Sequence, residues 1–137
     1  MMGGDYAPLE AVKGIALYLS NHNVPASLLL FGDKAGIENL LAEHSIPLEG
    51  ISIIHADQVI DMHEHPTRAL KEKQRSSIAM GFQLLASGKM DAFISAGNTG
   101  AMLVGALFSI KVLERVIRPT ISTVVPKSNG STGLLLD

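Results

Sequence analysis

The chain has 137 residues, of which 47% are hydrophobic and only 4% aromatic, with a mean hydropathy of +0.28. This composition is typical of one domain of aliphatic strands covered by helices, and it favours an α/β fold over a sandwich or barrel. The formal net charge of −2 gives no overall attraction to nucleic acid or to an anionic membrane. The lack of cysteine excludes a disulfide framework, a thiolate zinc site and a catalytic thiol, and it favours a reducing cytoplasm.

Helical and strand patterns alternate along the chain, and turn residues separate them. Pro8 suits a first helical turn, Asp33 a helix N-cap and Gly88 a helix C-cap, whereas Pro119 ends a helix. The predicted elements are helices over about 5–20, 34–44, 66–73, 76–87 and 101–115, strands over about 27–32, 51–55 and 91–96, and a terminal hairpin of strands over 120–126 and 132–136.

This alternation predicts an α/β fold, a three-layer α/β/α sandwich with a mixed, mainly parallel sheet and a ligand at the carboxyl ends of the strands. We expect residues 1–137 to form a single α/β domain. We further expect it to be the N-terminal portion of a longer enzyme, lacking the first strand and the C-terminal part. A Gly-Gly-Asp turn at Gly3 would normally follow a strand, and residues 134–137 stop where a functional loop is expected.

The sequence Gly97-Asn98-Thr99-Gly100 connects the predicted strand over 91–96 to an apolar helix. The two glycines let the backbone approach a ligand closely, and the free N–H groups at a helix N-terminus attract anions. The Asn98 amide and the Thr99 hydroxyl add directional hydrogen bonds. Two interpretations remain open, a phosphate site and a plain capped turn. The motif is neither GxGxxG nor a P-loop, so it does not support nucleotide binding.

A second candidate turn is formed by Gly3, Gly4 and Asp5 near the start of the chain. In a doubly wound sheet this turn would face the same crevice as the turn that begins at Gly97. Asp5 would then bind a ligand or orient a partner group. The alternative is that Asp5 is only the N-cap of the first helix.

The only dense group of basic residues lies before and within a predicted helix break, and two serines follow it. Lys73, Ser76 and Ser77 are the preferred members of an oxyanion clamp, because a new helix N-terminus would form there. The alternative is a solvated helix face. The group consists of Arg68, Lys71, Lys73, Arg75, Ser76 and Ser77.

Histidines and carboxylates at 61–65 invite a metal interpretation, but His63 and His65 converge only from a strand, which would point Glu64 the other way. No third ligand at a fixed spacing supports a metal site, so we expect a polar loop and no metal. His22, His44 and His55 are isolated, and we expect them to be surface or hydrogen-bonded residues. No G-x-S-x-G elbow is present, which disfavours a covalent acyl-serine mechanism.

Taken together, these motifs resemble the bacterial phosphate acyltransferase family, PlsX. The sequence Ser-Ala-Gly-Asn-Thr-Gly-Ala over 95–101 is specific, and Met-Gly-Gly-Asp over 2–5 reinforces it. The residues that carry the resemblance, in order, are 2–8, 59–62, Pro66, 69–73, Ser76, Ser77, 91–101, Arg118, Pro119 and 134–137.

The resemblance implies transfer of a long-chain acyl group from acyl carrier protein to inorganic phosphate, which gives acyl phosphate for phospholipid synthesis. It implies a cytoplasmic homodimer peripherally associated with membrane, with no cofactor and a fold similar to isocitrate and isopropylmalate dehydrogenases. Catalytic roles fall on Asn98, Asp5 and Lys73. The resemblance assigns phosphate binding to Gly3, Gly4, Ser76, Ser77, Gly97, Thr99 and Gly100.

Family members carry a strand before Met-Gly-Gly-Asp and continue well beyond Leu-Leu-Leu-Asp, so we expect the 137-residue chain alone to be inactive. Two other functions remain open. One is a nucleotide-binding, dehydrogenase-like domain, which the lack of GxGxxG disfavours. The other is a non-catalytic anion-binding module, which would bind phosphate without consuming a thioester.

Overall fold

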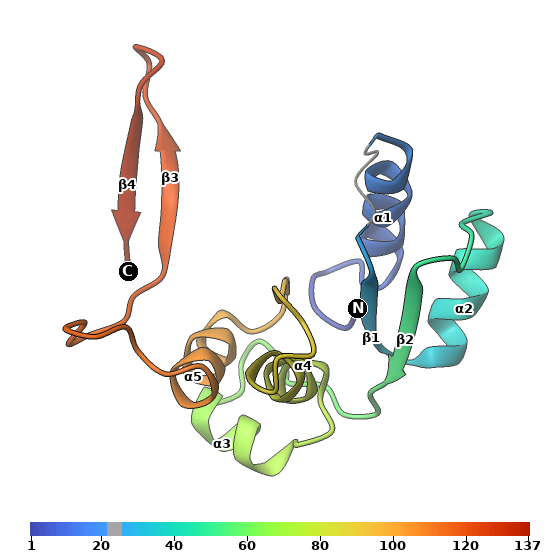
Figure 1. Cartoon of the computed structure of the whole chain (residues 1–137), viewed down its shortest axis with the longest axis horizontal. Helices are drawn as coiled ribbons and strands as arrows, with labels where there is room; N and C mark the ends of the chain where they lie inside the picture. Colours follow the sequence, from blue (N-terminus) through green and yellow to red (C-terminus); the bar gives the residue numbers. More distant parts are fainter. Residues whose placement is uncertain (22–25) are drawn as a thin grey trace.

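The computed structural model describes residues 1–21 and 26–137 (Figure 1). Its helices are α1 (Leu9–Asn21), α2 (Lys34–Glu43), α3 (Pro66–Glu72), α4 (Ser77–Ala86) and α5 (Thr99–Ser109). Its strands are β1 (Leu28–Gly32), β2 (Ile51–His55), β3 (Ser122–Pro126) and β4 (Thr132–Leu136). The predicted α/β class is therefore confirmed.

Helices cover both faces of a small parallel sheet made of β1 and β2, with Leu28 opposite Ile51. Because successive side chains of a strand point to opposite faces, Leu30 and Phe31 enter different cores. Leu30 packs with α1 and α2, whereas the Phe31 ring lies 6.0 Å from that of Phe93, on the side where α4 contacts β1. The first core consists of Val12, Leu30, Ile37, Leu41 and Ile46.

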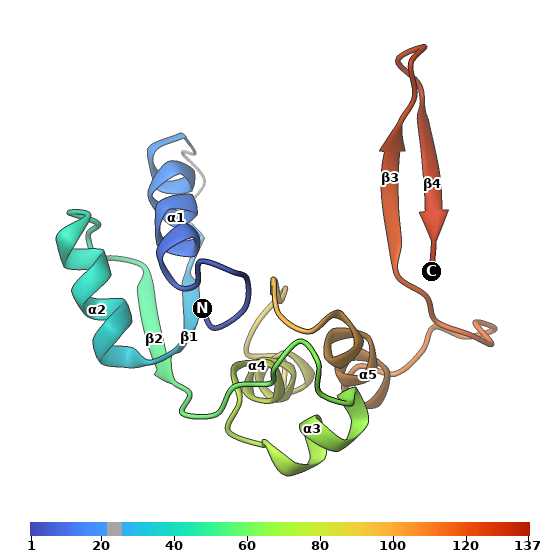
Figure 2. The same cartoon turned by 180° about the vertical axis from the view of Figure 1, so that it is seen from behind.

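A second core lies among α3, α4 and α5, which pack side by side (Figures 1 and 2). Phe93 joins this core to β1, because its ring makes edge contacts with Phe82 at 5.2 Å and with Phe31. Such edge-to-face pairs stabilise by about 0.5–1.5 kcal/mol beyond the burial of their area. The second core consists of Ile60, Ala69, Ile78, Phe82 and Ala101.

The predicted helix signals are found in the structure. The Asp33 carboxylate caps α2 by accepting the Gly36 N–H at 3.0 Å. Helix α4 ends at Ala86, Gly88 just beyond it has a φ of +69°, and the Lys89 N–H donates to the Leu84 carbonyl at 3.0 Å. This 6→1 hydrogen bond is part of a Schellman motif, so the predicted C-cap is confirmed.

Three predictions about the second half of the chain are wrong. Residues 91–96 form no strand, because they make no ladder with β1 or β2, and the β1–β2 sheet stays two-stranded. Helix α5 ends at Ser109 rather than near Arg115, and Lys111 has a left-handed φ of +70°. The predicted hairpin forms from β3 and β4, but as a separate sheet, so no single mixed sheet is present in the described residues.

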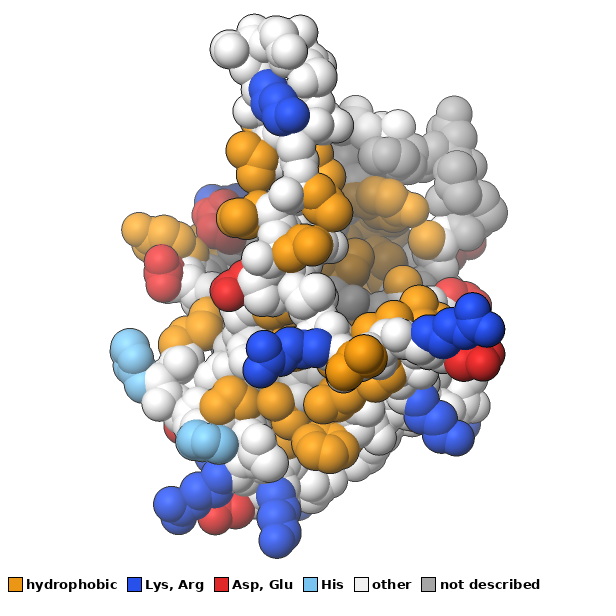
Figure 3. Space-filling view, turned by 90° about the vertical axis from the view of Figure 1, so that its left-hand side faces the viewer, with side chains coloured by type: hydrophobic (Ala, Val, Ile, Leu, Met, Phe, Trp, Pro, Cys, Tyr) orange, Lys and Arg blue, Asp and Glu red, His pale blue; other side chains and the backbone are white. Residues whose placement is uncertain are grey.

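The β3–β4 hairpin extends away from the helices (Figures 1 and 2). Its apolar side chains are exposed, including Val124, Leu134 and Leu135. Figure 3 shows further apolar side chains on the surface beside the hairpin. Across the part of the chain that the structure describes, no helix is both long enough and apolar enough to span a bilayer.

Replacement of Gly105 by alanine tests the packing of the second core. A Cβ at this position would lie 2.4 Å from the Phe82 Cδ2 atom, and the ring is buried. We expect Gly105→Ala to lower the free energy of unfolding by about 1–3 kcal/mol, measured by urea denaturation. Gly14→Ala is the matched control, because a Cβ at this helical glycine meets no atom within 4 Å. It should stabilise by about 0.5–1 kcal/mol, and equal effects would contradict the packing.

Candidate active site

The two glycine-rich turns predicted from the sequence lie in direct backbone contact. A Cβ built on Gly3 would lie 2.4 Å from both the Cα and the N of Gly97. The start of the chain reaches this point along β1, because the Met1 amino group donates to the Phe31 carbonyl at 2.7 Å, and its burial lowers its pKa. Gly4 has a φ of +98°, and Asp5 is exposed beside it. The turns therefore meet beyond the carboxyl end of β1, as predicted.

The glycine turn over 97–100 leaves backbone N–H groups at the start of α5 for a ligand. The Gly97 N–H is used, because it donates to the Ser95 Oγ at 3.0 Å. The Ala101 N–H is also used, because the Asn98 Oδ1 accepts it at 2.9 Å. Thr99 and Gly100 are the first two residues of α5, so their N–H groups precede the first helical hydrogen bond. These N–H groups and the helix dipole form a candidate anion-binding element.

Asn98 is 4% exposed, and both ends of its amide are engaged. In addition to capping α5, its Nδ2 donates to the carbonyls of Asp61 at 2.8 Å, Met62 at 3.3 Å and Glu64 at 3.2 Å. The Asn98 side chain thus joins the start of α5 to the loop over 61–64. In this arrangement it positions the turn.

Gly100 has a packing role that sequence reasoning did not find. A Cβ at Gly100 would lie 2.5 Å from the Pro66 Cγ, which belongs to the first residue of α3. The absence of a side chain therefore lets α5 start directly against α3.

The predicted oxyanion clamp lies at the break between α3 and α4, but its polar groups have partners within the protein. The Lys73 ammonium donates to the Val59 carbonyl at 2.7 Å and to the Glu64 carboxylate. Ser76 is fully buried, and its hydroxyl caps α4 by accepting the Ala79 N–H at 3.3 Å. Ser77, the first residue of α4, is half-buried.

The remaining cations of this group are solvated, which agrees with the alternative that the sequence left open. Arg68 pairs with Glu72 at 2.9 Å and Arg75 with Asp57 at 2.6 Å. The hydrogen bond and charge of Glu72 raise the Arg68 pKa. These exposed pairs contribute little to stability.

Glu64 is a connecting residue that sequence reasoning missed. Its carboxylate accepts the Asp61 N–H at 2.8 Å as well as the Lys73 ammonium, and these two bonds lower its pKa, the Lys73 bond most. No motif spacing relates Glu64 to Lys73, so only the fold reveals the pair. Together with Asn98, this carboxylate fixes both sides of the loop over 61–64.

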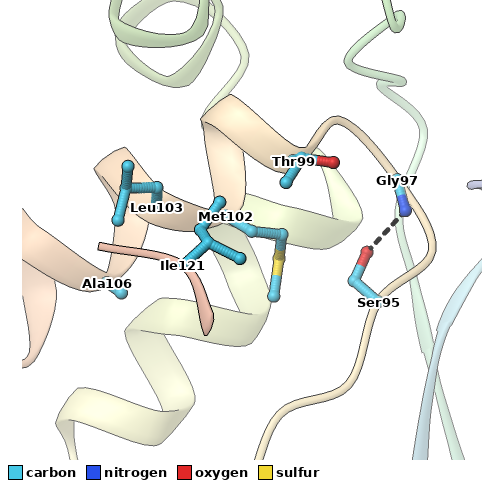
Figure 4. Close-up of a pocket in the computed structure, with 7 residues that line it drawn as sticks. All are labelled: Ser95, Gly97, Thr99, Met102, Leu103, Ala106 and Ile121. Atoms are coloured by element: carbon cyan, nitrogen blue, oxygen red, sulfur yellow. Dashed lines mark hydrogen bonds between the residues drawn. The ribbon is translucent and has the colours of Figure 1, made fainter. Parts of the chain in front are cut away.

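A groove of about 300 Å³ begins beside the turn (Figure 4). One end is polar, with the Ser95 hydroxyl directed at the Gly97 nitrogen and the Thr99 hydroxyl on the same side of α5. The other end is apolar. The apolar lining consists of Met102, Leu103, Ala106 and Ile121. The groove therefore suits a molecule with a polar end and an aliphatic tail.

The described residues contain no group of three or more His, Cys, Asp or Glu side chains placed to hold a metal ion. His63 and His65 are exposed, and the Glu64 between them turns to Lys73. The His55 Nδ1 accepts the Lys34 N–H at 3.2 Å, so this histidine is hydrogen-bonded as expected. His44 is exposed, and His22 lies outside the described residues.

These features define an α/β protein with a candidate anion site between two glycine turns and an adjoining apolar groove. The chain matches the family described as "Fatty acid synthesis protein" over residues 1–137, and it belongs to that family. A phosphate acyltransferase of Dictyoglomus turgidum is 41% identical over 136 residues, which cover 99% of this chain and 40% of the relative. The resemblance to phosphate acyltransferases is thereby confirmed.

Other curated relatives with the same name give a similar picture. The phosphate acyltransferase of Thermoanaerobacterium thermosaccharolyticum is 39% identical over 134 residues, which cover 98% of this chain and 38% of the relative. That of Pelotomaculum thermopropionicum is 41% identical over 136 residues, with 98% and 38% covered. The chain thus spans about two fifths of the length of these relatives.

Replacement of Gly3 by alanine tests the contact between the two turns. The new Cβ would overlap the Gly97 backbone, so one turn must move. We expect Gly3→Ala to shift the Gly97 and Thr99 amide resonances and to weaken phosphate binding, both measured by NMR titration. Gly14→Ala, in open space on α1, is the control. Unchanged Gly97 resonances in Gly3→Ala would contradict the contact.

The Glu64–Lys73 pair predicts a pH dependence of stability. The folded-state pKa of Glu64 lies below its ordinary value of 4.5, so the pair stabilises the fold above that pH. This stability is lost as the pH falls through the lowered pKa. We expect the difference in unfolding free energy between the parent chain and Glu64→Gln to shrink from about pH 6 to about pH 3, measured by urea denaturation.

The control for this pH prediction is Glu49→Gln, at an exposed carboxylate that forms no ion pair within the described chain. Its stability difference from the parent should vary less with pH. A Glu64→Gln difference that stays constant over the same range would contradict the role of the pair.

Proposed function

We propose that the complete polypeptide carrying this sequence transfers a long-chain acyl group from acyl carrier protein to inorganic phosphate. The product is an acyl phosphate for phospholipid synthesis. The observation that carries the proposal is the groove, whose largely apolar lining includes Thr99 at the start of α5, where the N–H groups have no helical partner. Membership of the fatty acid synthesis family and relatives named phosphate acyltransferase support it.

The chemistry requires alignment more than an enzyme nucleophile. An oxygen of hydrogen phosphate attacks the thioester carbonyl carbon, and the carbonyl oxygen becomes an oxyanion. The oxyanion then collapses, the C–S bond breaks, and the proton of hydrogen phosphate ends on the thiol of the carrier. Preorganised donors at the phosphate and at the oxyanion lower the barrier, because little reorganisation is needed during the reaction.

Each predicted residue has a proposed role in this scheme. The N–H groups of Thr99 and Gly100 bind phosphate, and Gly3, Gly4 and Gly97 let it approach the backbone. Asp5, exposed at the edge of the same turn, orients the substrates. The connecting network of Asn98, Lys73, Ser76 and Ser77 holds the two helix starts, and Lys73 also supplies positive charge on the phosphate side.

The proposal extends to the setting of the complete protein. It is cytoplasmic, works without a cofactor, associates peripherally with membrane and forms a homodimer. Its fold is similar to that of isocitrate and isopropylmalate dehydrogenases. Residues 1–137 alone are expected to be inactive, because they span about two fifths of the length of the relatives.

The test is the loss of thioester from a long-chain acyl carrier protein, measured with and without phosphate on the complete gene product. We expect phosphate-dependent turnover, and a loss of about 10²-fold or more in Asn98→Ala, because the variant releases both the α5 cap and the loop over 61–64. Asn39→Ala, on the exposed side of α2, is the matched control and should retain activity.

Two outcomes would contradict the proposal in different ways. Phosphate binding without any thioester loss would favour the non-catalytic anion-binding module. Equal turnover in the parent protein and Asn98→Ala would retain the acyltransferase but remove Asn98 from its machinery.

A further inference from the structure

The Ser95 hydroxyl has an unused donor at the polar end of the groove. Its Oγ accepts the Gly97 N–H at 3.0 Å, and the hydroxyl makes no other hydrogen bond within the described residues. A serine hydroxyl carries one proton and two acceptor sites, so the accepted bond fixes the oxygen and leaves the proton free. Ser95 is therefore held in place by the same turn whose next N–H groups are free for an anion.

The position of Ser95 relates it to the acyl substrate. It lines the groove together with Met102 and Ile121, which form part of the apolar lining (Figure 4). An aliphatic chain bound along these residues brings its carbonyl group to the polar end. The charge of phosphate is met by the start of α5 at Thr99 and Gly100. The two substrates thus have different partners at the polar end of the groove.

We propose that Ser95 is a further catalytic residue, which donates a hydrogen bond to the thioester carbonyl oxygen as that oxygen becomes an oxyanion. This assignment rests on the acyl transfer proposed above. The hydroxyl forms no covalent bond with the acyl group. The negative charge that develops on the carbonyl oxygen strengthens the hydrogen bond in the transition state, so Ser95 acts on kcat.

The experiment compares the complete enzyme with Ser95→Ala and Ser95→Thr by steady-state kinetics at varied phosphate. We expect Ser95→Ala to lower kcat by about 10²-fold or more, with the KM for phosphate within about twofold of the parent. Ser95→Thr keeps the hydroxyl at this position and should restore most of the lost kcat. Ser109→Ala, at the far end of α5, is the matched control.

Other results would overturn the assignment. If the only role of Ser95 is to fix the Gly97 turn, Ser95→Ala should raise the KM for phosphate and lower the melting temperature without changing kcat. An unchanged kcat in Ser95→Ala, or a kcat that Ser95→Thr fails to restore, would equally overturn it.

Failure of the proposed function gives a different result. If the parent enzyme shows no phosphate-dependent thioester loss, the acyl transfer and the Ser95 role fall together. If the parent turns over and Ser95→Ala turns over equally, only the Ser95 role falls.

Discussion

Three carbonyls of one loop converge on a single buried amide, that of Asn98, and the candidate site depends on this interaction. The oxygen of the same amide caps α5, so the loop over 61–64 and the helix start move as one unit. The Glu64 carboxylate extends the connection to Lys73 at the end of α3. Leaving the buried Asn98 amide without its partners would be costly, which favours this one geometry of the network.

The site lies where the second core meets β1. Phe93 contacts Phe31 of β1 and Phe82 of α4, and it precedes the glycine turn by a few residues. The segment around Phe93 is therefore held by ring packing and not by a strand ladder. This packing brings the turn against Gly3, so a side-chain cluster supports a site made largely of main-chain donors.

Local signals allowed much of the fold to be predicted, because they act within a few residues. Asp33 and Gly88 cap their helices as predicted, and the Asn129-Gly130 sequence lies in the predicted hairpin turn. The failures concern residues 91–96 and the end of α5, which depend on long-range partners. A run of apolar residues has strand character whether or not a neighbouring strand is free to pair with it.

For the candidate site, the sequence predicted which turns are involved but not how their side chains are used. The two glycine turns lie in contact, as expected for turns at one edge of an α/β fold, although neither follows a strand in the structure. The partners of Asn98 and Lys73 were not predictable, because each bond crosses between segments with no fixed spacing. Sequence spacing predicts which side chains share a face of one helix or strand. The contacts of this site join different helices and loops, so spacing does not predict them.

The contact between Gly3 and Gly97 links ligand affinity to folding. The two halves of the candidate anion site come from distant parts of the chain, so an unfolded chain has no such site, and phosphate bound there would bind only the native state. Saturation at about a hundred times the dissociation constant would then stabilise the fold by about 2.7 kcal/mol. The supply of inorganic phosphate would in this way set the resistance of the protein to unfolding and proteolysis.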